Sequence, residues 1–496
     1  MKNEEVIALK STINVQAKEI KILQEKVDYL IRQRFTPSSE KFNSNQPSLF
    51  EEEKQEIIIE DDPEVEHIEV KKKKGGKRPI PKDLPITRIE HDISEADKIC
   101  ECGECLVRMK ELSSYQYDVT PARFSVIENI RFVYVCSDKC GAGVKTVPVA
   151  PSVLPKAQVT PSLLAMIGVQ KFEDSLPLTR QAKIFKQRFG VPFNDTTLSN
   201  WMIRASELRL TPIIDRLEEY LLKCNYIQAD ETTLQVLKEK NKKAQSKSYL
   251  WLRVSQEGKA IVLLNYSANR SSTTAESLFN GFKGHLQTDG YPGYNSVAKR
   301  DDVIQLGCWA HARRKFSDIV KSGVSDSQSK AYAAEAIEMI ATLYKIEKEI
   351  KDLPPNEKLS IRDKKSRPIV KKIKSWLEEN FLRVQALDGA IAKAFVYLNN
   401  QFIKLSVFLE DGHLSIDNNN AERHVRPIAL GRKNWLFATS TKGAVALANW
   451  FSIIETAKAN KLDPYKYLTY LFTQLPLYER DDLDIEPLLP WNVDLA

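Results

Sequence analysis

The hydrophobic pattern changes its period several times along the chain, and its first stretch is a heptad repeat over residues 4–34. Two positions of the repeat are mostly apolar: Val6, Ile13, Ile20 and Val27 at the first, and Leu9, Gln16, Leu23 and Leu30 at the second. β-Branched residues at one position and mainly Leu at the other favour a parallel two-stranded coiled coil. An amphipathic helix packed on its own chain is the alternative. The coiled coil predicts a homodimer.

The periodicity then disappears over residues 36–95. An acidic block at residues 51–69 is followed by a basic block from Lys71 to Lys82. Segments of this kind bury too little apolar surface to fold, so we expect a charged flexible linker. Its basic block either binds DNA phosphates nonspecifically or stays solvated.

A helical period returns over residues 150–223. The sequence predicts a helix to Phe189, a turn at Gly190 and a second helix beginning near Asp195 or Thr196. This arrangement is typical of a helix-turn-helix, although a plain helical hairpin has the same pattern. The side chains that would face DNA are those of Thr196, Ser199, Asn200 and Arg204.

From Tyr226 the pattern becomes that of strands. Residues 226–237, 249–255 and 261–267 predict three antiparallel strands, followed by a helix over 274–282 and strands at 285–289 and 303–309. This is the order expected of an RNase H-like sheet. A basic helix with His311, Arg313 and Arg314 follows the fifth strand closely enough to contact a substrate phosphate, or else presents a structural His on a solvated face. Residues 321–405 predict a helical insertion whose Lys and Arg either contact DNA or only face solvent.

The stretch from Ile416 to Phe437 places one carboxylate among many cations. Asp417 and the Asn residues after it are helix N-caps, so Glu422 and Arg423 should lie in a short helix that Pro427 ends or kinks. Further candidate DNA ligands follow, namely Arg426, Arg432, Lys433 and Trp435. Two readings stay open here: Glu422 could pair with Arg426 on the helix surface, and Trp435 could belong to the core.

Three carboxylates are candidate metal ligands. Asp230 lies in the middle of a predicted strand, where a charge is costly unless it is paired or bound to metal. Asp289 precedes Gly290 and could be only a turn residue. Together with Glu422 these residues could hold two Mg²⁺ or Mn²⁺ ions about 4 Å apart, suited to cleaving a phosphodiester.

The cysteines are clustered rather than spread. Cys102 and Cys105 are spaced CxxC, and Cys136 and Cys140 follow after about thirty residues, which predicts one structural Zn²⁺ site. Cys100 is a competing ligand. A four-thiolate site has no open coordination position, so we expect no catalysis there.

Composition agrees with a multidomain protein. The chain has 496 residues, 42% of them hydrophobic and 28% charged, and a net charge of +7 that is segregated into blocks. No apolar run approaches the roughly 18 residues of a membrane span, and the N-terminus lacks a signal-peptide core. We therefore expect a cytoplasmic protein without membrane partners.

The blocks ADETTLQV, TDGYPGY, CWAHARRKF and DNNNAERHVRPIALGRKNWLF resemble those of the IS66-family insertion-sequence transposases. The resemblance covers nearly the whole chain. It implies a DDE triad at Asp230, Asp289 and Glu422 on an RNase H-like core, and a nucleoid-associated bacterial enzyme that acts on terminal inverted repeats and target DNA. It also implies small accessory proteins from the same element. One departure is that ECGEC lacks the family's adjacent-Cys pattern, which leaves the role of Cys100 open.

The sequence thus predicts a multidomain α+β protein in eight segments. These are a coiled coil (1–35), a linker (36–95), a zinc-binding domain (96–148), a helix-turn-helix region (150–223), a catalytic core in two parts (224–320 and 406–460) around a helical insertion (321–405), and a C-terminal tail (461–496). The predicted activity is metal-dependent DNA cleavage and strand transfer. The alternatives are a zipper-dimerised DNA-binding regulator with an idle core and a nuclease without strand transfer.

Overall fold

The computed structural model describes residues 123–135, 144–146, 148–255, 257–322, 327–387 and 389–495. The predicted coiled coil, the linker and all four cysteines of the predicted zinc site lie outside these ranges. Next to the cysteines, β1 (Val133–Val135) and β2 (Val144–Thr146) form a short antiparallel ribbon. Residues 123–132, which precede β1, form no regular strand.

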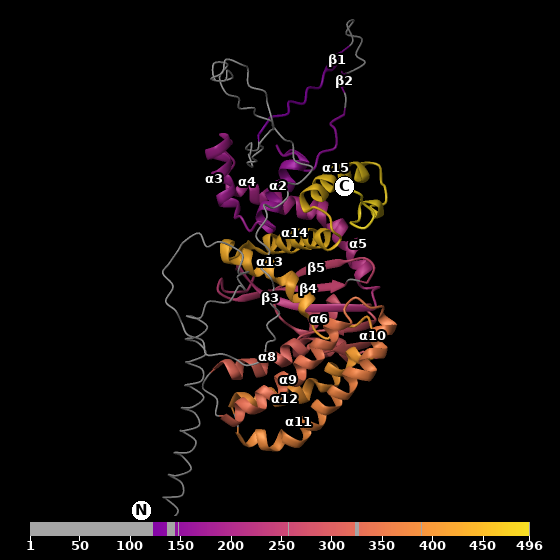
Figure 1. The fold of residues 1–496 in the computed structure, drawn as a ribbon. Coiled ribbons are helices and arrows are strands. Elements are labelled where there is room, and N and C mark those ends of the chain that lie inside the picture. The colour runs from indigo at the N-terminus through magenta and orange to yellow at the C-terminus, as the bar shows by residue number, and fades with distance from the viewer. Residues whose placement is uncertain are drawn as a thin grey trace, which may run out of the picture. The chain divides into compact units, whose positions relative to one another are not determined.

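A mixed sheet of six strands lies at the centre of the α+β fold (Figure 1). Its strands are β3 (Tyr226–Lys238), β4 (Lys247–Ser255), β5 (Ile261–Ser267), β6 (Gly284–Gln287), β7 (Val303–Leu306) and β8 (Ala438–Ser440). The order is β5-β4-β3-β6-β7, with β8 beside the far end of β3. β3, β4 and β5 are antiparallel, whereas β6, β7 and β8 run parallel to β3. The five strands predicted from the sequence are therefore confirmed.

The long strand β3 has an open stretch along one edge. On that edge Tyr226–Gln228 pair with β6, and pairing resumes only at Val236, with β8. The helix α13 (Asn419–Trp435) packs against β3 and its neighbour β4. Helix α13 continues through Pro427 to Trp435, so the prediction of a short helix is wrong.

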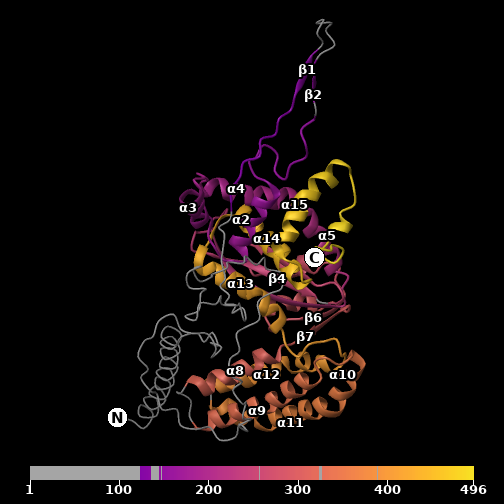
Figure 2. The ribbon, with the colours of Figure 1, turned by 45° about the horizontal axis from the view of Figure 1, so that its top comes forward.

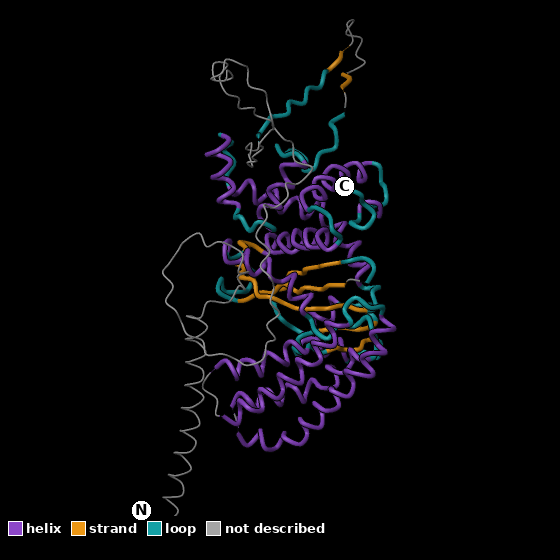
Figure 3. The backbone as a smooth tube through the Cα atoms, viewed as in Figure 1, coloured by secondary structure: helices purple, strands orange, loops and turns teal. Residues whose placement is uncertain are grey.

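Helices cover the sheet on the side of β4 and β5 (Figures 1 and 3). The helix α14 (Thr441–Ala459) packs against β5, and α2 (Pro161–Phe172) and α15 (Pro464–Arg480) pack on its other side. Because it lies between two layers, α14 is buried nearly all round rather than amphipathic. Its hydroxyl groups also close the outer edge of β5: Thr456 Oγ1 accepts from Val262 N (3.0 Å), and Ser452 Oγ accepts from Leu264 N (2.8 Å).

The predicted helix pair before the sheet is confirmed. Helix α3 (Leu178–Phe189) ends at Gly190, whose φ of 69° is the left-handed conformation that glycine readily adopts. Helix α4 (Asp195–Ala205) then begins after Asn194, whose side chain accepts from Thr197 N at 2.7 Å. A π-helical turn and α5 (Thr211–Leu221) lead on to β3.

The predicted helical insertion is also confirmed, between β7 and α13 (Figure 2). It follows α8 (Trp309–Ser322) and consists of α9 (Ser327–Glu349), α10 (Pro355–Ile361), α11 (Arg367–Leu387) and α12 (Gly389–Ser406). Helices α9, α11 and α12 share a hydrophobic core with α8. Arg362 is buried and binds Glu347 with two hydrogen bonds of 2.7 and 2.8 Å. Arg362 is therefore structural and is not one of the cations that could hold DNA. Within the described ranges, no helix has the length and apolar character needed to cross a membrane.

Candidate active site

Asp230 lies on the open edge of β3, next to the helix that carries Glu422. Asn418, just before α13, is fully buried, and its Nδ2 donates to the carbonyl of Ala229 at 2.9 Å. Near the other end of the helix, Arg432 donates to the carbonyl of Thr233. Since none of the described strands pairs with this part of the edge, the two side chains bind β3 carbonyls that face no neighbouring strand. Helix α13 is thereby tied to the strand of Asp230 at both ends.

The segment leading into α13 is held by buried amide side chains. Gln228 Nε2 donates to the carbonyl of Asp417 (3.0 Å), and Gln287 Nε2 donates to the carbonyl of Ser415 (2.9 Å). The Asp417 carboxylate accepts from Asn419 N at 3.1 Å, but the N-cap residue is Asn418, whose side chain makes no capping hydrogen bond. Side chains of β3 and β6 thus fix the segment that precedes Glu422.

Asp289 lies two residues beyond β6, in a tight turn. Its Oδ1 accepts from Tyr291 N (2.9 Å), and its carbonyl accepts from the hydroxyl of Tyr397 on α12 (2.8 Å). Gly290 has a φ of 89°, and a Cβ there would lie only 3.1 Å from the side chain of Gln401. Asp289 is therefore a turn residue, and the helical insertion holds it beside the sheet.

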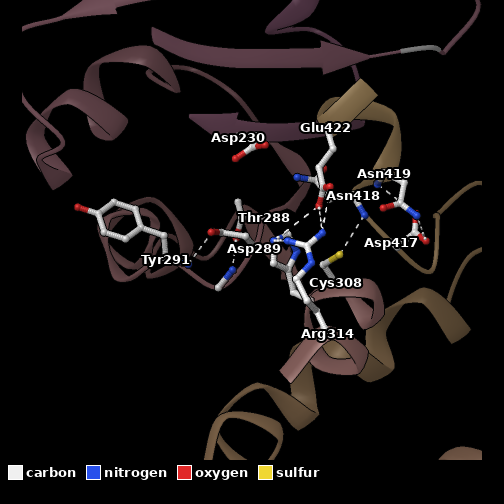
Figure 4. A network of polar contacts seen from close by, with 12 residues as sticks. Asp230, Thr288, Asp289, Tyr291, Cys308, Arg314, Asp417, Asn418, Asn419 and Glu422 are labelled. Carbon is white, nitrogen blue, oxygen red and sulfur yellow. Dashed lines mark hydrogen bonds and ion pairs between the residues drawn. The ribbon is translucent and has the colours of Figure 1, made fainter. Parts of the chain in front are cut away.

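Glu422 faces the same space as the two aspartates (Figure 4). Its carboxylate pairs with Arg314 Nη2 at 3.2 Å and lies 3.6 Å from His311 Nε2, both on α8. Among the ion pairs of the described residues, Glu422 has these partners and not Arg426, the surface partner that the sequence left open. Burial, and then the charge of Arg314, lower the pKa of His311, which keeps the imidazole neutral at pH 7.

The three carboxylates act on one another electrostatically. Burial, followed by the charge of Glu231, raises the pKa of Asp230 to about 7, and the charges of Asp289 and Glu422 contribute smaller parts of this rise. Carboxylate oxygens are the ligands that Mg²⁺ prefers, and a dication would relieve this accumulated negative charge. The donor set therefore fits a hard divalent cation. In the part of the chain that the structure describes, however, no three His, Cys, Asp or Glu side chains already lie close enough to form a metal site.

The sequence analysis missed Glu231, a fourth carboxylate at this site. Its side chain is 2% exposed, accepts from Tyr294 Oη at 2.6 Å and pairs with Arg270. The same guanidinium lies 4.0 Å from Asp289 Oδ2 and stacks on the ring of Tyr291. Both carboxylate oxygens of Glu231 therefore already have a partner. Glu231 also holds the guanidinium of Arg270 beside Asp289. The sequence does contain a signal for Glu231, because it is a second acidic residue next to Asp230 in the same predicted strand.

Some of the predicted DNA ligands are exposed and others are not. Exposed residues are Thr196 and Asn200 on α4, Arg313 and Arg314 on α8, and Arg423, Arg426 and Lys433 on α13, whereas Ser199 and His311 are partly buried. Arg204 donates to the carbonyl of Pro155 at 2.7 Å. A surface hollow is lined by residues of α4 and the start of α14, not by the three acids.

Trp435 and Arg432 are occupied within the fold. Trp435 is only 9% exposed and belongs to the hydrophobic core, the alternative that the sequence left open. Its ring is not available for stacking on a base in this conformation. Arg432 binds β3 and therefore does not present a free phosphate clamp.

Comparison with known proteins gives one consistent result. The family model described as "Transposase IS66 family" matches residues 156–446, the "IS66 C-terminal element" matches 452–491, and "Transposase C of IS166 homeodomain" matches 22–89. The uncharacterized protein y4jD of Sinorhizobium fredii is 32% identical over 428 residues, which cover 83% of this chain and 81% of that protein. Two further uncharacterized proteins of the same organism, y4hP and y4qI, are 28% and 32% identical and cover 85% and 82% of this chain and 77% and 76% of their own lengths.

Proposed function

Because the chain belongs to the IS66 family of transposases, we propose that it is a DDE-type enzyme that binds the terminal inverted repeats of its insertion sequence, cleaves DNA there and joins the freed end to target DNA. One observation supports this most. Asp230, Asp289 and Glu422 come from three distant parts of the chain, and they surround one space at the edge of the sheet (Figure 4).

The arrangement of the strands supports the proposal. Three antiparallel strands followed by two strands parallel to the first, in the order β5-β4-β3-β6-β7, is the order expected of an RNase H-like core. Asp230 lies on the central strand, Asp289 follows the neighbouring parallel strand, and Glu422 lies in the first turn of the helix that returns from the insertion. A phosphodiester could thus reach all three from one side.

The chemistry would be divided between a divalent cation and the side chains around it. Asp230, Asp289 and Glu422 would hold Mg²⁺ or Mn²⁺, which stabilises the attacking and leaving oxygens of a phosphodiester. Glu231 is not the general base, because Tyr294 and Arg270 already bind its carboxylate. The role we assign to Glu231 is to hold Arg270 beside Asp289.

DNA binding would involve several surfaces. The exposed cations Arg423, Arg426 and Lys433 follow Glu422 along α13 and would bind backbone phosphates near the cleavage point. Thr196, Ser199 and Asn200 on α4 would face bases. The match of residues 22–89 to a model whose description includes a homeodomain also agrees with a DNA partner. A coiled-coil homodimer, a structural Zn²⁺ at Cys102, Cys105, Cys136 and Cys140, and accessory proteins of the element complete the proposal.

The test is an assay on labelled duplexes of the element's terminal repeats with Mg²⁺ and a target plasmid. Wild type should cleave the repeat end and join it to the target. Asp230→Ala should bind the repeat but do neither, because it lacks one metal ligand. Asp301→Ala is the matched control, since it removes an exposed carboxylate from the turn before β7. This variant should behave like wild type.

Three other outcomes of this assay would contradict the proposal, and each would indicate a different function or site. Cleavage without joining would identify a nuclease, and binding without cleavage by wild type would identify a DNA-binding regulator. Full activity of Asp230→Ala would show that the reaction occurs at another site.

A further inference from the structure

Arg314 competes with metal for the same carboxylate. Its Nη2 lies 3.2 and 3.4 Å from the two oxygens of Glu422, so both oxygens face a guanidinium. His311 Nε2 lies 3.6 Å from Oε1 and 3.4 Å from Arg314 Nη1, which completes a cluster of three side chains. A guanidinium held against both oxygens uses part of their lone pairs and repels a second cation, so the carboxylate binds a divalent cation more weakly while Arg314 is in place. The ion pair and metal ligation by Glu422 therefore compete.

The ion pair is also easy to break. The side chain of Arg314 is 52% exposed, against 22% for that of Glu422, and exposed ion pairs contribute little to stability because water screens them. A guanidinium binds a phosphate in the same two-pronged manner as it binds a carboxylate. Arg314 is one turn from the start of α8, beside the acids that would receive the scissile phosphate. A DNA phosphate could thus replace Glu422 as its partner.

We propose that Arg314 exchanges partners, binding Glu422 or a DNA phosphate, and thereby makes completion of the metal site depend on bound DNA. This inference rests on the proposed function, because it assumes that Glu422 is a metal ligand. When the backbone phosphate takes Arg314, the Glu422 carboxylate is free to join Asp230 and Asp289. By thermodynamic linkage, DNA then raises the affinity for metal, and metal raises the affinity for DNA by the same factor.

The experiment measures Mn²⁺ binding by the electron paramagnetic resonance of free Mn²⁺, with the full chain. The ligand is a terminal-repeat duplex with a dideoxy 3′ end, which cannot be joined, and Mn²⁺ bound by the duplex alone is subtracted. Without DNA, Arg314→Gln should bind Mn²⁺ about fivefold more tightly than wild type, a typical size for such coupling. Added duplex should tighten Mn²⁺ binding by wild type and leave Arg314→Gln nearly unchanged.

Lys315→Gln is the matched control. Lys315 is the exposed residue next to Arg314 on the same helix, so its replacement removes one positive charge without removing the Glu422 ion pair. It should bind Mn²⁺ like wild type and keep the response to DNA. If only the general charge mattered, Lys315→Gln and Arg314→Gln would behave alike, and DNA would tighten Mn²⁺ binding by both.

Two results would overturn the inference. One is equal Mn²⁺ affinity of wild type and Arg314→Gln without DNA, and the other is an unchanged DNA effect in Arg314→Gln. Failure of the proposed function is distinguishable, because a variant with both Asp230→Ala and Asp289→Ala would then bind Mn²⁺ like wild type. If that double variant loses Mn²⁺ binding while Arg314→Gln changes nothing, only the exchange is refuted.

Discussion

Replacing Asp230 by Asn should stabilise the fold while removing a proposed metal ligand. Burial and the neighbouring carboxylates raise the pKa of Asp230 from 3.8 to about 7. Because the pKa is higher in the folded protein than in the unfolded chain, the protonated carboxyl favours folding, and this contribution is lost as the pH rises from about 4 through about 7. Above pH 7 the folded protein holds an ionised carboxylate that destabilises it. Asn cannot ionise, and its Oδ1 can still accept the hydrogen bond from Glu231 N.

The size of the effect follows from the pKa. Each tenfold change in the ionisation constant is worth about 1.4 kcal/mol, so a rise from 3.8 to about 7 corresponds to about 4 kcal/mol at pH 8. Part of Asp230 still reaches water, and we therefore expect roughly half of this, about 2 kcal/mol. At pH 5 the gain should be smaller by about 1–2 kcal/mol, because the folded carboxyl is then mostly protonated.

The assay is urea-induced unfolding of wild type and Asp230→Asn in EDTA at pH 5 and pH 8, with Asp301→Asn as the exposed control. Asp230→Asn should raise the midpoint at pH 8 more than at pH 5, and Asp301→Asn should shift neither. Added Mg²⁺ should stabilise wild type and not Asp230→Asn, since a ligand that binds only the folded state stabilises it. The reasoning would be refuted if Asp230→Asn raised the unfolding midpoint equally at both pH values, or lowered it at pH 8.

Three further changes test the packing around the site. Asn418→Ala leaves the buried carbonyl of Ala229 without its hydrogen-bond donor. Urea denaturation should show a loss of about 1–3 kcal/mol in the free energy of unfolding, and a turnover assay should show slower DNA cleavage. Arg362→Met leaves the buried carboxylate of Glu347 without its guanidinium partner, so the free energy of unfolding should fall by about 3–5 kcal/mol. Relative to wild type, amide hydrogen exchange should become faster in the helical insertion more than in the rest of the protein. Gly168→Ala would place its Cβ 2.2 Å from the ring of Trp450, so thermal unfolding should show a loss of about 1–3 kcal/mol, and an unchanged midpoint would contradict this packing.

The sequence predicted the elements better than the contacts between them. The strands of the sheet and the turn at Gly190 follow from local patterns, because alternation, helical period and glycine conformation are properties of short segments. Pro427 was misjudged because its local effect on a helix is outweighed here by the packing of α13 on β3.

The candidate site shows the same limit. Asp230 was recognisable because a charge within a strand needs a partner. Asn418 was expected to cap a helix, yet its side chain binds the strand of Asp230, a long-range contact that no local pattern predicts. The partner of Glu422 was likewise sought one turn away, at Arg426, whereas Arg314 lies far away in the sequence and reaches it only through the fold.

The closed edge of β5 has a consequence for biosynthesis. An uncovered strand edge is a template for intermolecular β-aggregation, and here the groups that cover it are hydroxyls on Ser452 and Thr456. These residues leave the ribosome long after β5 itself. The nascent chain therefore exposes an aggregation-prone edge of β5 throughout the synthesis of the helical insertion. A product truncated before α14 should be recovered in inclusion bodies rather than in the supernatant.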